Sequence, residues 1–427
     1  MKLIVHIIFI SIAFSQTSSL SMYGLGEYIN SIDASSVALG DSKYFGGYDN
    51  RISFSSPSSY WKSSLSNLMM SVSTNINDFS GSKLVENNFK LFAFTFPVSK
   101  RGVCAFGMNP LVRSEFDVSE NNFTTLGADN SPTGEPIAFK TDYSFSGGIS
   151  EFFILYSTKV TNNISFGFRW SKLFGTSKNK YYLNIYDLSF EPNSDQDPMP
   201  TYSNPTVDSF IDNNRYSSNK YLLEFRFEHD KVNAVLSYGE SQSLNIEHTP
   251  FYCGSSSDSD CENYYNIYSS QVVTEYYVSN NKLLENGIGL EYELNKRLSL
   301  IFEHHQLDSF NAYDFINIFK NDNPDIRSDH IGFYYKFNND INSIVNQSII
   351  KFGIFNKINK FKNVTIYDRG LTFGCGINYF NNKSFIDFSF KMGVKSTEYN
   401  AFEDEKYYSI MISLLGGEKW FINERNK

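Results

Sequence analysis

The chain has 427 residues, of which 19% are charged, and a formal net charge of −9. We expect no nucleic-acid partner, because nucleic-acid-binding proteins are usually basic. Mean hydropathy is −0.33, and no interior apolar run reaches the roughly 18 residues that a transmembrane helix needs. Aromatic content is high, with 29 Tyr and 40 Phe, which favours a protein with a large lipid-facing surface and aromatic girdles.

Residues 1–15 are predicted to be a cleaved signal peptide. Lys2 provides a positive charge, residues 3–14 form an apolar run, and Ala13-Phe14-Ser15 has the small-x-small pattern of a cleavage site. The run is too short to span a bilayer, and a buried N-terminal helix is the alternative. Export without a transmembrane helix leaves the periplasm, the cell surface or the outer membrane of a Gram-negative bacterium. The strands described next favour the outer membrane.

Residues 16–65 differ from the rest of the chain. They are rich in Ser, Gly and Asn and lack sustained alternation, so we expect short helical turns and loops. A compact polar segment ahead of a barrel is suited to lie inside it. These residues are therefore predicted to be an N-terminal plug or hatch, with a flexible periplasmic tail as the alternative.

From residue 67 onward the sequence alternates with period 2, as a strand between an apolar and a polar environment does. In one stretch Phe388, Phe390 and Met392 share one face, and Asp387 and Lys391 share the other. Charged residues on the polar face suit a barrel with lipid outside and a polar lumen. Strands of membrane-crossing length are predicted at residues 67–76, 89–98, 102–112, 144–157, 163–174, 220–229, 232–243, 285–294, 297–306, 329–337, 347–357, 366–379, 384–395 and 406–416.

The predicted connections alternate between short and long. Short ones lie at residues 99–100, 161–163, 229–231, 295–296, 338–346 and 381–383, and long ones at 113–143, 175–219, 244–284 and 307–328. Short periplasmic turns opposite long outer loops are typical of transmembrane barrels. The sequence therefore predicts an all-β fold, a transmembrane antiparallel β-barrel of about 14 strands over residues 66–421, with the plug in its lumen and a periplasmic tail at 422–427.

Charged side chains of both signs fall on the predicted inner faces of the strands. They are Arg169, Glu224, Arg226, Glu228, Glu291, Glu293, Glu303, Lys336, Lys351, Asp387 and Lys391. Confining charge to the lumen avoids the cost of placing it in hydrocarbon. Mixed signs predict salt bridges that brace a filled barrel against its plug, which argues against a general diffusion porin.

No catalytic motif is present, so the chain is predicted not to be an enzyme and to need no cofactor. His304 and His305 are adjacent on a strand and therefore face opposite ways. The acidic pairs at 195–197 and 258–260 lie in loops with oxygen ligands nearby, which leaves calcium open. Solvated acidic loops are the simpler interpretation, and no metal site is predicted.

The chain has four cysteines. Cys253 and Cys261 bracket a polar segment and are predicted to form a small loop disulfide in an oxidising compartment. Cys104 and Cys375 are interpreted as small apolar residues of strands.

The signal peptide, the segment Ser36-Val37-Ala38-Leu39-Gly40 and the turn Ser56-Pro57-Ser58 before the first strand resemble the FadL/TodX family of outer-membrane transport proteins. PorV-like proteins of type IX secretion look similar and belong to the same wider group. The resemblance implies a barrel with an N-terminal hatch, in which Ser56, Pro57 and Ser58 stand at the family's Asn-Pro-Ala turn. It also implies passive uptake of hydrophobic compounds, such as long-chain fatty acids, across the outer membrane.

Two functions follow as hypotheses. In the first, an outer-loop groove captures a hydrophobic small molecule, although part of its spacing also fits an amphipathic loop helix on the rim. The candidate groove residues are Phe310, Tyr313, Phe315, Ile316 and Phe319. In the second, a PorV-like or structural barrel holds exported proteins and needs no substrate path. Outer-membrane lipid is an expected partner in both, and an apolar channel past the plug would favour the first.

Overall fold

The computed structural model describes residues 24–46, 52–79, 82–126, 135–191, 199–255, 274–310, 324–337, 348–362, 364–379, 384–398 and 404–418. Its strands are β1 (Glu27–Tyr28), β2 (Ser66–Phe79), β3 (Ser82–Pro97), β4 (Gly102–Leu126), β5 (Glu135–Lys159), β6 (Ile164–Glu191), β7 (Met199–His229), β8 (Val232–Ser241), β9 (Asn245–Ser255), β10 (Glu275–Val278), β11 (Leu284–Asn295), β12 (Leu298–Asp308), β13 (Asp325–Lys336), β14 (Ser348–Lys360), β15 (Thr365–Tyr379), β16 (Ser384–Thr397) and β17 (Glu405–Glu418). Two short helices precede β2, namely α2 (Ala34–Val37) and the 3-10 helix η2 (Pro57–Lys62). Within these ranges no helix is long and apolar enough to cross a bilayer.

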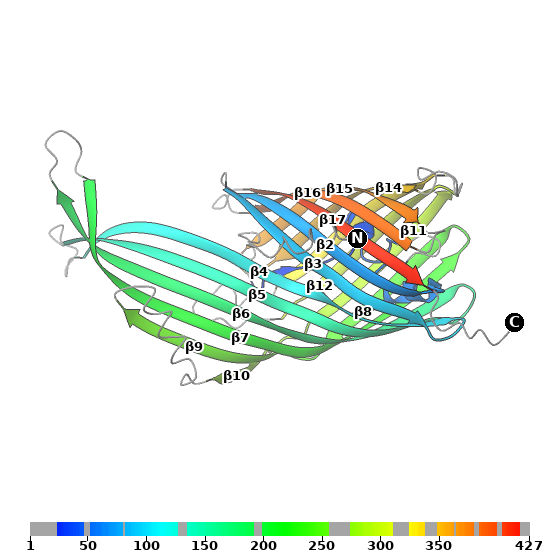
Figure 1. Cartoon of the computed structure of the whole chain (residues 1–427), viewed down its shortest axis with the longest axis horizontal. Helices are drawn as coiled ribbons and strands as arrows, with labels where there is room; N and C mark the ends of the chain where they lie inside the picture. Colours follow the sequence, from blue (N-terminus) through cyan, green and yellow to red (C-terminus); the bar gives the residue numbers. More distant parts are fainter. Residues whose placement is uncertain are drawn as a thin grey trace.

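Fourteen of these strands close into an antiparallel barrel. The strands from β2 to β8 and from β11 to β17 pair in sequence order, β17 pairs with β2, and β11 pairs with β8. At one rim β9 follows β8 along the edge of β7, and β10 pairs with β9. The predicted strands are all found, in the predicted order, so the all-β barrel prediction is confirmed (Figure 1).

The predicted long connections are partly wrong. β4, β5, β6 and β7 have 25, 25, 28 and 31 residues, so strand covers most of 113–143 and 175–219. A tilted strand crosses a bilayer in about 9–11 residues, and the sheet of β4 to β7 projects well beyond the remaining strands (Figure 1). In the projecting parts of β4 and β7 apolar alternation ends while the hydrogen-bonded ladder continues. A prediction based on alternation therefore stops too early.

A belt of exposed apolar side chains surrounds the barrel. Each of the fourteen strands carries at least one large apolar side chain exposed to the outside, among them Phe225 at 51%, Leu236 at 60% and Phe373 at 50%. Contiguous apolar surface of this extent is rare on water-soluble proteins. An outward apolar band is the expected lipid-facing surface of a transmembrane barrel.

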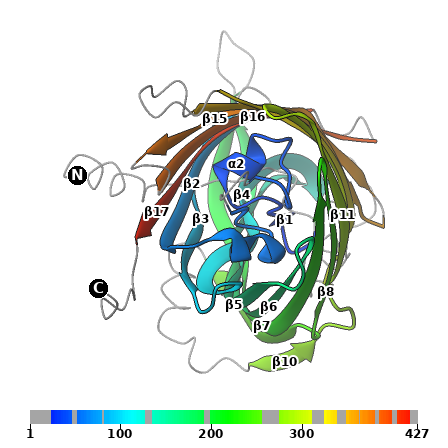
Figure 2. The same cartoon turned by 90° about the vertical axis from the view of Figure 1, so that its right-hand side faces the viewer.

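Residues 24–46 and 52–65, called the inner segment below, lie inside the ring of strands (Figure 2). Within this segment β1 pairs with β4 at Val112 and Arg113. α2 contacts β15, β16 and β17, and η2 contacts β4 to β7. Tyr60 of η2 is fully buried in an apolar cluster with wall residues. The inner segment is therefore packed against both halves of the wall.

Several predicted regions lie outside the described residues. They are the signal peptide at 1–15, the first part of the plug up to residue 23, and the tail at 422–427. Their boundaries stay predictions.

One junction of the barrel is paired over only part of its length. Phe92–Pro97 of β3 pair with Val103–Met108 of β4. Beyond this ladder, among the described residues, Ser82–Leu91 of β3 pair with β2 alone, and β4 pairs with β5 and, toward β3, with the two residues of β1. Pro110 and a β-bulge lie where the two strands part. Because proline lacks a backbone N–H, it favours edges and bulges. We call this opening the β3/β4 seam.

Candidate functional site

Buried carboxylates bind the inner segment to the wall, and the first is Glu224 of β7. It accepts hydrogen bonds from the hydroxyls of Ser56 and Ser58 and, at 3.1 Å, from the backbone N–H of Ser58. Arg226 shares the lumen face and donates to the hydroxyls of Ser58 at 3.0 Å and Ser56 at 2.8 Å. The turn Ser56-Pro57-Ser58 is thus held at a charged site inside the barrel.

Glu303 of β12 holds a second turn of the inner segment. Its carboxylate accepts three consecutive backbone N–H groups, from Lys43 at 2.7 Å, Tyr44 at 3.0 Å and Phe45 at 3.1 Å. Nε2 of His305, on the same face of β12, lies 2.9 Å from the carboxylate. Hydrogen bonds to an ionised acceptor are about twice as strong as neutral ones, so this site fixes the course of the segment.

α2 contacts the wall, and the turn that follows it packs directly on the wall's backbone. Asp33 caps the helix by accepting the backbone N–H of Ser36 at 2.8 Å. Burial raises the pKa of Asp33 to about 6, against the opposing effect of the hydrogen bonds from Ser36. A Cβ added to Gly353 of β14 would overlap the backbone of Gly40. The close approach of the inner segment therefore requires a glycine in the wall.

Ion pairs join the inner segment to β16. Asp41 lies 3.0 Å from Lys391, and Glu27 lies 2.9 Å from Lys395. Burial alone would raise the pKa of Asp41, but Lys391 and then His330 outweigh burial and lower it to about 2. The pKa of Glu27 is likewise lowered to about 2, with Lys395 opposing burial. Both carboxylates are thus ionised at neutral pH.

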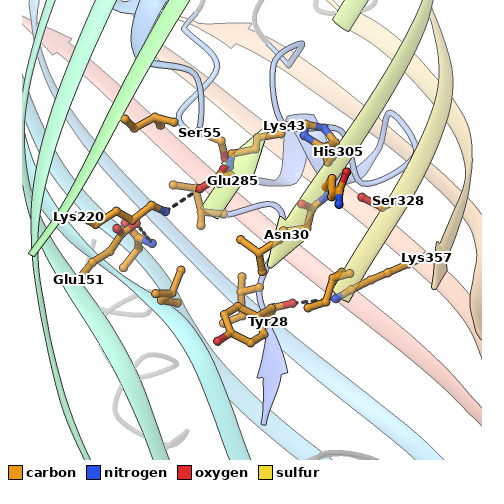
Figure 3. A pocket seen from close by; sticks show the side chains of 18 of the residues that line it. Tyr28, Asn30, Lys43, Ser55, Glu151, Lys220, Glu285, His305, Ser328 and Lys357 are labelled. Atoms are coloured by element: carbon orange, nitrogen blue, oxygen red, sulfur yellow. Dashed lines mark hydrogen bonds and ion pairs between the residues drawn. The ribbon is translucent and has the colours of Figure 1, made fainter. Parts of the chain in front are cut away.

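A further ionic cluster lies between the inner segment and the wall strands β5, β6, β7 and β11. Arg169 is ion-paired with Glu151, and Lys220 lies 2.8 Å from Glu285. Lys43 of the inner segment shares Glu285 (Figure 3). These side chains line a cavity of about 70 Å³. Such a lining suits water or ions, because a hydrocarbon would desolvate the charges without replacing their partners.

A second cavity, of about 100 Å³, lies between the inner segment and β2, β3, β16 and β17. Its lining includes Glu27, Asp41, Glu86, Lys90, Arg113 and Lys391. By comparison, an apolar cavity of about 150 Å³ binds benzene. Both cavities are smaller and carry charges. Among the described residues, neither provides an apolar path through the lumen.

The predicted lumen charges fall into three groups. Glu224, Arg226, Glu303, Asp387 and Lys391 contact the inner segment or buried side chains that bind it. In particular, Lys351 lies 3.1 Å from Asp387 and donates to Ser35. Arg169 binds the wall side chains Glu151 and Asn109. Glu228, Glu291, Glu293 and Lys336 line a hollow of about 280 Å³ beside the 229–231 turn, where Glu228 also lies 2.5 Å from Lys62 of the inner segment.

Sequence reasoning missed seven members of the ion pairs and ionic cluster. Glu27, Asp41 and Lys43 lie in the inner segment, where no alternation indicates which side chains face the wall. Lys220, Glu285 and Lys395 lie at the ends of predicted strands, where a rim position was equally compatible with the pattern. Glu151 stands inside a predicted strand, so its inward position was open to detection.

The remaining candidate residues are only partly described. Phe310 is fully buried in an apolar cluster that includes Leu25 and Tyr28 of the inner segment, while Tyr313, Phe315, Ile316 and Phe319 lie outside the described residues. The groove therefore stays a prediction. So does the disulfide between Cys253 and Cys261, because Cys261 is also outside them. Cys104 and Cys375 are half-buried free thiols in strands.

Solved structures with a similar fold include a FadL homologue and two toluene transporters, by their titles. A Pseudomonas aeruginosa FadL homologue matches with a TM-score of 0.55 and 10% identity, covering 92% of this chain and 98% of its own. The Pseudomonas putida toluene transporter TodX matches with a TM-score of 0.50 and 11% identity, covering 92% of this chain and 100% of its own. The Ralstonia pickettii toluene transporter TbuX matches with a TM-score of 0.50 and 10% identity, covering 91% of this chain and 99% of its own. Identities this low show a shared fold alone.

The sequence comparisons give one family. No curated protein matches the chain. A family model described as BamG matches residues 1–427.

Proposed function

The chain belongs to the BamG family, and from this premise we propose that it is a closed, non-enzymatic outer-membrane barrel that binds a polypeptide partner. The observation that carries the closed state is the fixation of the inner segment by Glu224 and Glu303, which between them accept hydrogen bonds from Ser56, Ser58 and three consecutive backbone N–H groups. This supports the interpretation of the inner segment as a plug that stays in place.

The lumen offers little to a hydrophobic solute. Moving the plug would break the hydrogen bonds that Glu224 and Glu303, both 0% exposed, accept from it, and bonds to buried carboxylates are among the stronger ones. With the plug in place, the cavities of about 70 and 100 Å³ are charged. A barrel of this kind presents its wall, its rim and the projecting sheet of β4 to β7 to other molecules.

Transport assays on reconstituted protein test the closed state. In planar bilayers and liposomes we expect no conductance and no uptake of labelled toluene or palmitate above protein-free membranes. The variant Glu303→Ala, which releases the 43–45 turn, is expected to raise conductance and so shows that the barrel is inserted. Saturable uptake by the unmodified protein would contradict the proposal.

Native mass spectrometry after gentle extraction from outer membranes tests the partner. We expect a co-purifying polypeptide in a fixed ratio. A fatty acid or hydrocarbon in a fixed ratio, with no polypeptide, would instead support transport.

Uptake of a hydrophobic compound is the second candidate function. It is favoured by the shared fold of the toluene transporters and by the apolar cluster that contains Phe310, Leu111 and Ile149. It requires the plug to move during uptake. Phe310→Asp would then lower uptake, whereas a closed barrel has no uptake to lose.

A further inference from the structure

The β3/β4 seam leaves backbone groups of β3 without a described partner. From Ser82 to Leu91, β3 is paired with β2 on one side only. Successive residues of an antiparallel strand direct their N–H and C=O groups to alternate sides. About half of the backbone groups in these ten residues therefore point away from β2 into the seam.

The unpaired edge lies at the depth of the lipid belt. Val85 and Phe89 of this stretch are 46% and 37% exposed. Phe89 faces Val72 on β2, which is itself 41% exposed on the belt. Exposed sheet edges do not occur within the hydrocarbon region of a bilayer, because no water is present to satisfy their hydrogen bonds. An edge in this position needs an occupant.

The inner segment fills only a small part of the seam. β1 contributes two residues, which pair with Val112 and Arg113 on the opposite strand, β4. The backbone N–H of Ile29 adds one hydrogen bond to the carbonyl of Leu111 at 3.0 Å. These contacts show that the seam accepts extended chain. They do not reach the free edge of β3.

The two faces of the free edge define the occupant's chemistry. Val85 and Phe89 face outward, whereas Glu86, Asn88 and Lys90 are buried on the inner side and line the cavity of about 100 Å³. A molecule in the seam therefore meets lipid on one side and charged groups on the other. It must also offer donors and acceptors at strand spacing, which excludes an acyl chain.

We propose that the β3/β4 seam accepts an added transmembrane β-strand from a partner polypeptide. The added strand pairs with Ser82–Leu91 of β3 by β-augmentation. Its side chains alternate between apolar residues toward lipid and polar residues toward Glu86 and Lys90. Ten residues match the roughly 9–11 that cross a bilayer in a tilted strand. This inference deepens the proposed function by locating the partner's contact, and it rests on that function.

Hydrogen exchange tests the pairing in the intact protein. Amide exchange is measured for the 82–91 region in outer-membrane vesicles and again after purification without the partner. We expect it to be about tenfold or more slower in the vesicles. The control is 371–376 on β15, which is paired with β14 and β16 and should exchange slowly in both samples. Equal exchange of 82–91 in both, whether fast or slow, would overturn the proposal.

Photocrosslinking identifies the occupant. The photoreactive residue p-benzoylphenylalanine is placed at Phe89 and, as a control with comparable lipid exposure on a fully paired strand, at Phe373. From Phe89 we expect an adduct whose peptide alternates between apolar and polar residues, and from Phe373 lipid adducts only. Lipid alone at Phe89, or a peptide of this same chain, would overturn the proposal.

The two proposals fail in different experiments. A barrel that does not conduct and retains its polypeptide partner, but shows no adduct at Phe89, refutes the strand in the seam and leaves the proposed function intact. Saturable solute uptake with no partner in native mass spectrometry refutes the proposed function itself.

Discussion

Ser58 donates its backbone N–H to Glu224 across 3.1 Å, and this contact joins the turn before the first barrel strand to β7, 166 residues away. The carboxylate is inaccessible to solvent, so its hydrogen bonds have no competing water. The contact gives the inner segment a fixed position relative to the wall, and its removal has measurable consequences.

Glu224→Gln should loosen the inner segment. The amide keeps the volume but is a weaker acceptor than a carboxylate for Ser56 and Ser58, and it leaves Arg226 with less compensation. We expect a loss of about 1–3 kcal/mol in unfolding free energy, measured by urea titration in detergent micelles. Glu240→Gln, at an exposed ion pair with Lys282, is the control and should change little. An unchanged Glu224→Gln variant would refute the anchoring role.

Gly353→Ala should displace the inner segment without altering charge. The added Cβ would overlap the backbone of Gly40, and overpacking of this kind costs about 1–3 kcal/mol. Gly416→Ala is the matched control, because a Cβ there meets nothing within 4 Å. Thermal unfolding followed by heat-dependent mobility on gels compares the two. Equal midpoints would show that the inner segment does not approach the wall at Gly353.

Acid should weaken the attachment at Asp41. Its pKa is lowered from 3.8 to about 2 in the folded state. The stability that ionised Asp41 contributes is therefore complete above about pH 4 and is lost as pH falls toward 2. The shift corresponds to about 2 kcal/mol. In urea titrations between pH 6 and pH 2, Asp41→Asn should show a shallower fall in stability than the unmodified protein. Asp230→Asn, in an exposed turn, should lose as much stability between pH 6 and pH 2 as the unmodified protein does. A stability curve for Asp41→Asn that runs parallel to that of the unmodified protein would contradict the assignment.

Charge on the lipid belt should be costly at mid-strand and tolerated at the rim. Phe373→Arg places a cation on the outer face of β15, where arginine at the bilayer midplane costs about 2–4 kcal/mol. Tyr276→Arg, at a rim residue that is 77% exposed, should fold into lipid vesicles with little change. Folding yield in vesicles measures both. A small effect at Phe373 would place the belt outside the membrane.

The sequence by itself determined the barrel, the order of its strands and the sign pattern of its lumen. Alternation such as Phe388 and Met392 against Asp387 and Lys391 is a local property, because successive side chains of any strand point to opposite faces. The apolar belt follows directly from it. The same rule predicts only strands of membrane-crossing length, which is why the long extensions of β4 to β7 were predicted as loops.

Only the tertiary structure decided which charges meet and where the wall is incomplete. The contacts of Glu224 with Ser58 and of Glu303 with Tyr44 span 166 and 259 residues, and no local pattern encodes such pairings. The seam is similar: Pro110 is visible in the sequence, but proline alone does not show that Ser82–Leu91 lack a partner beyond β2. The physical reason is that strand registers and lumen contacts depend on closure of the whole barrel, whereas alternation depends only on neighbouring residues.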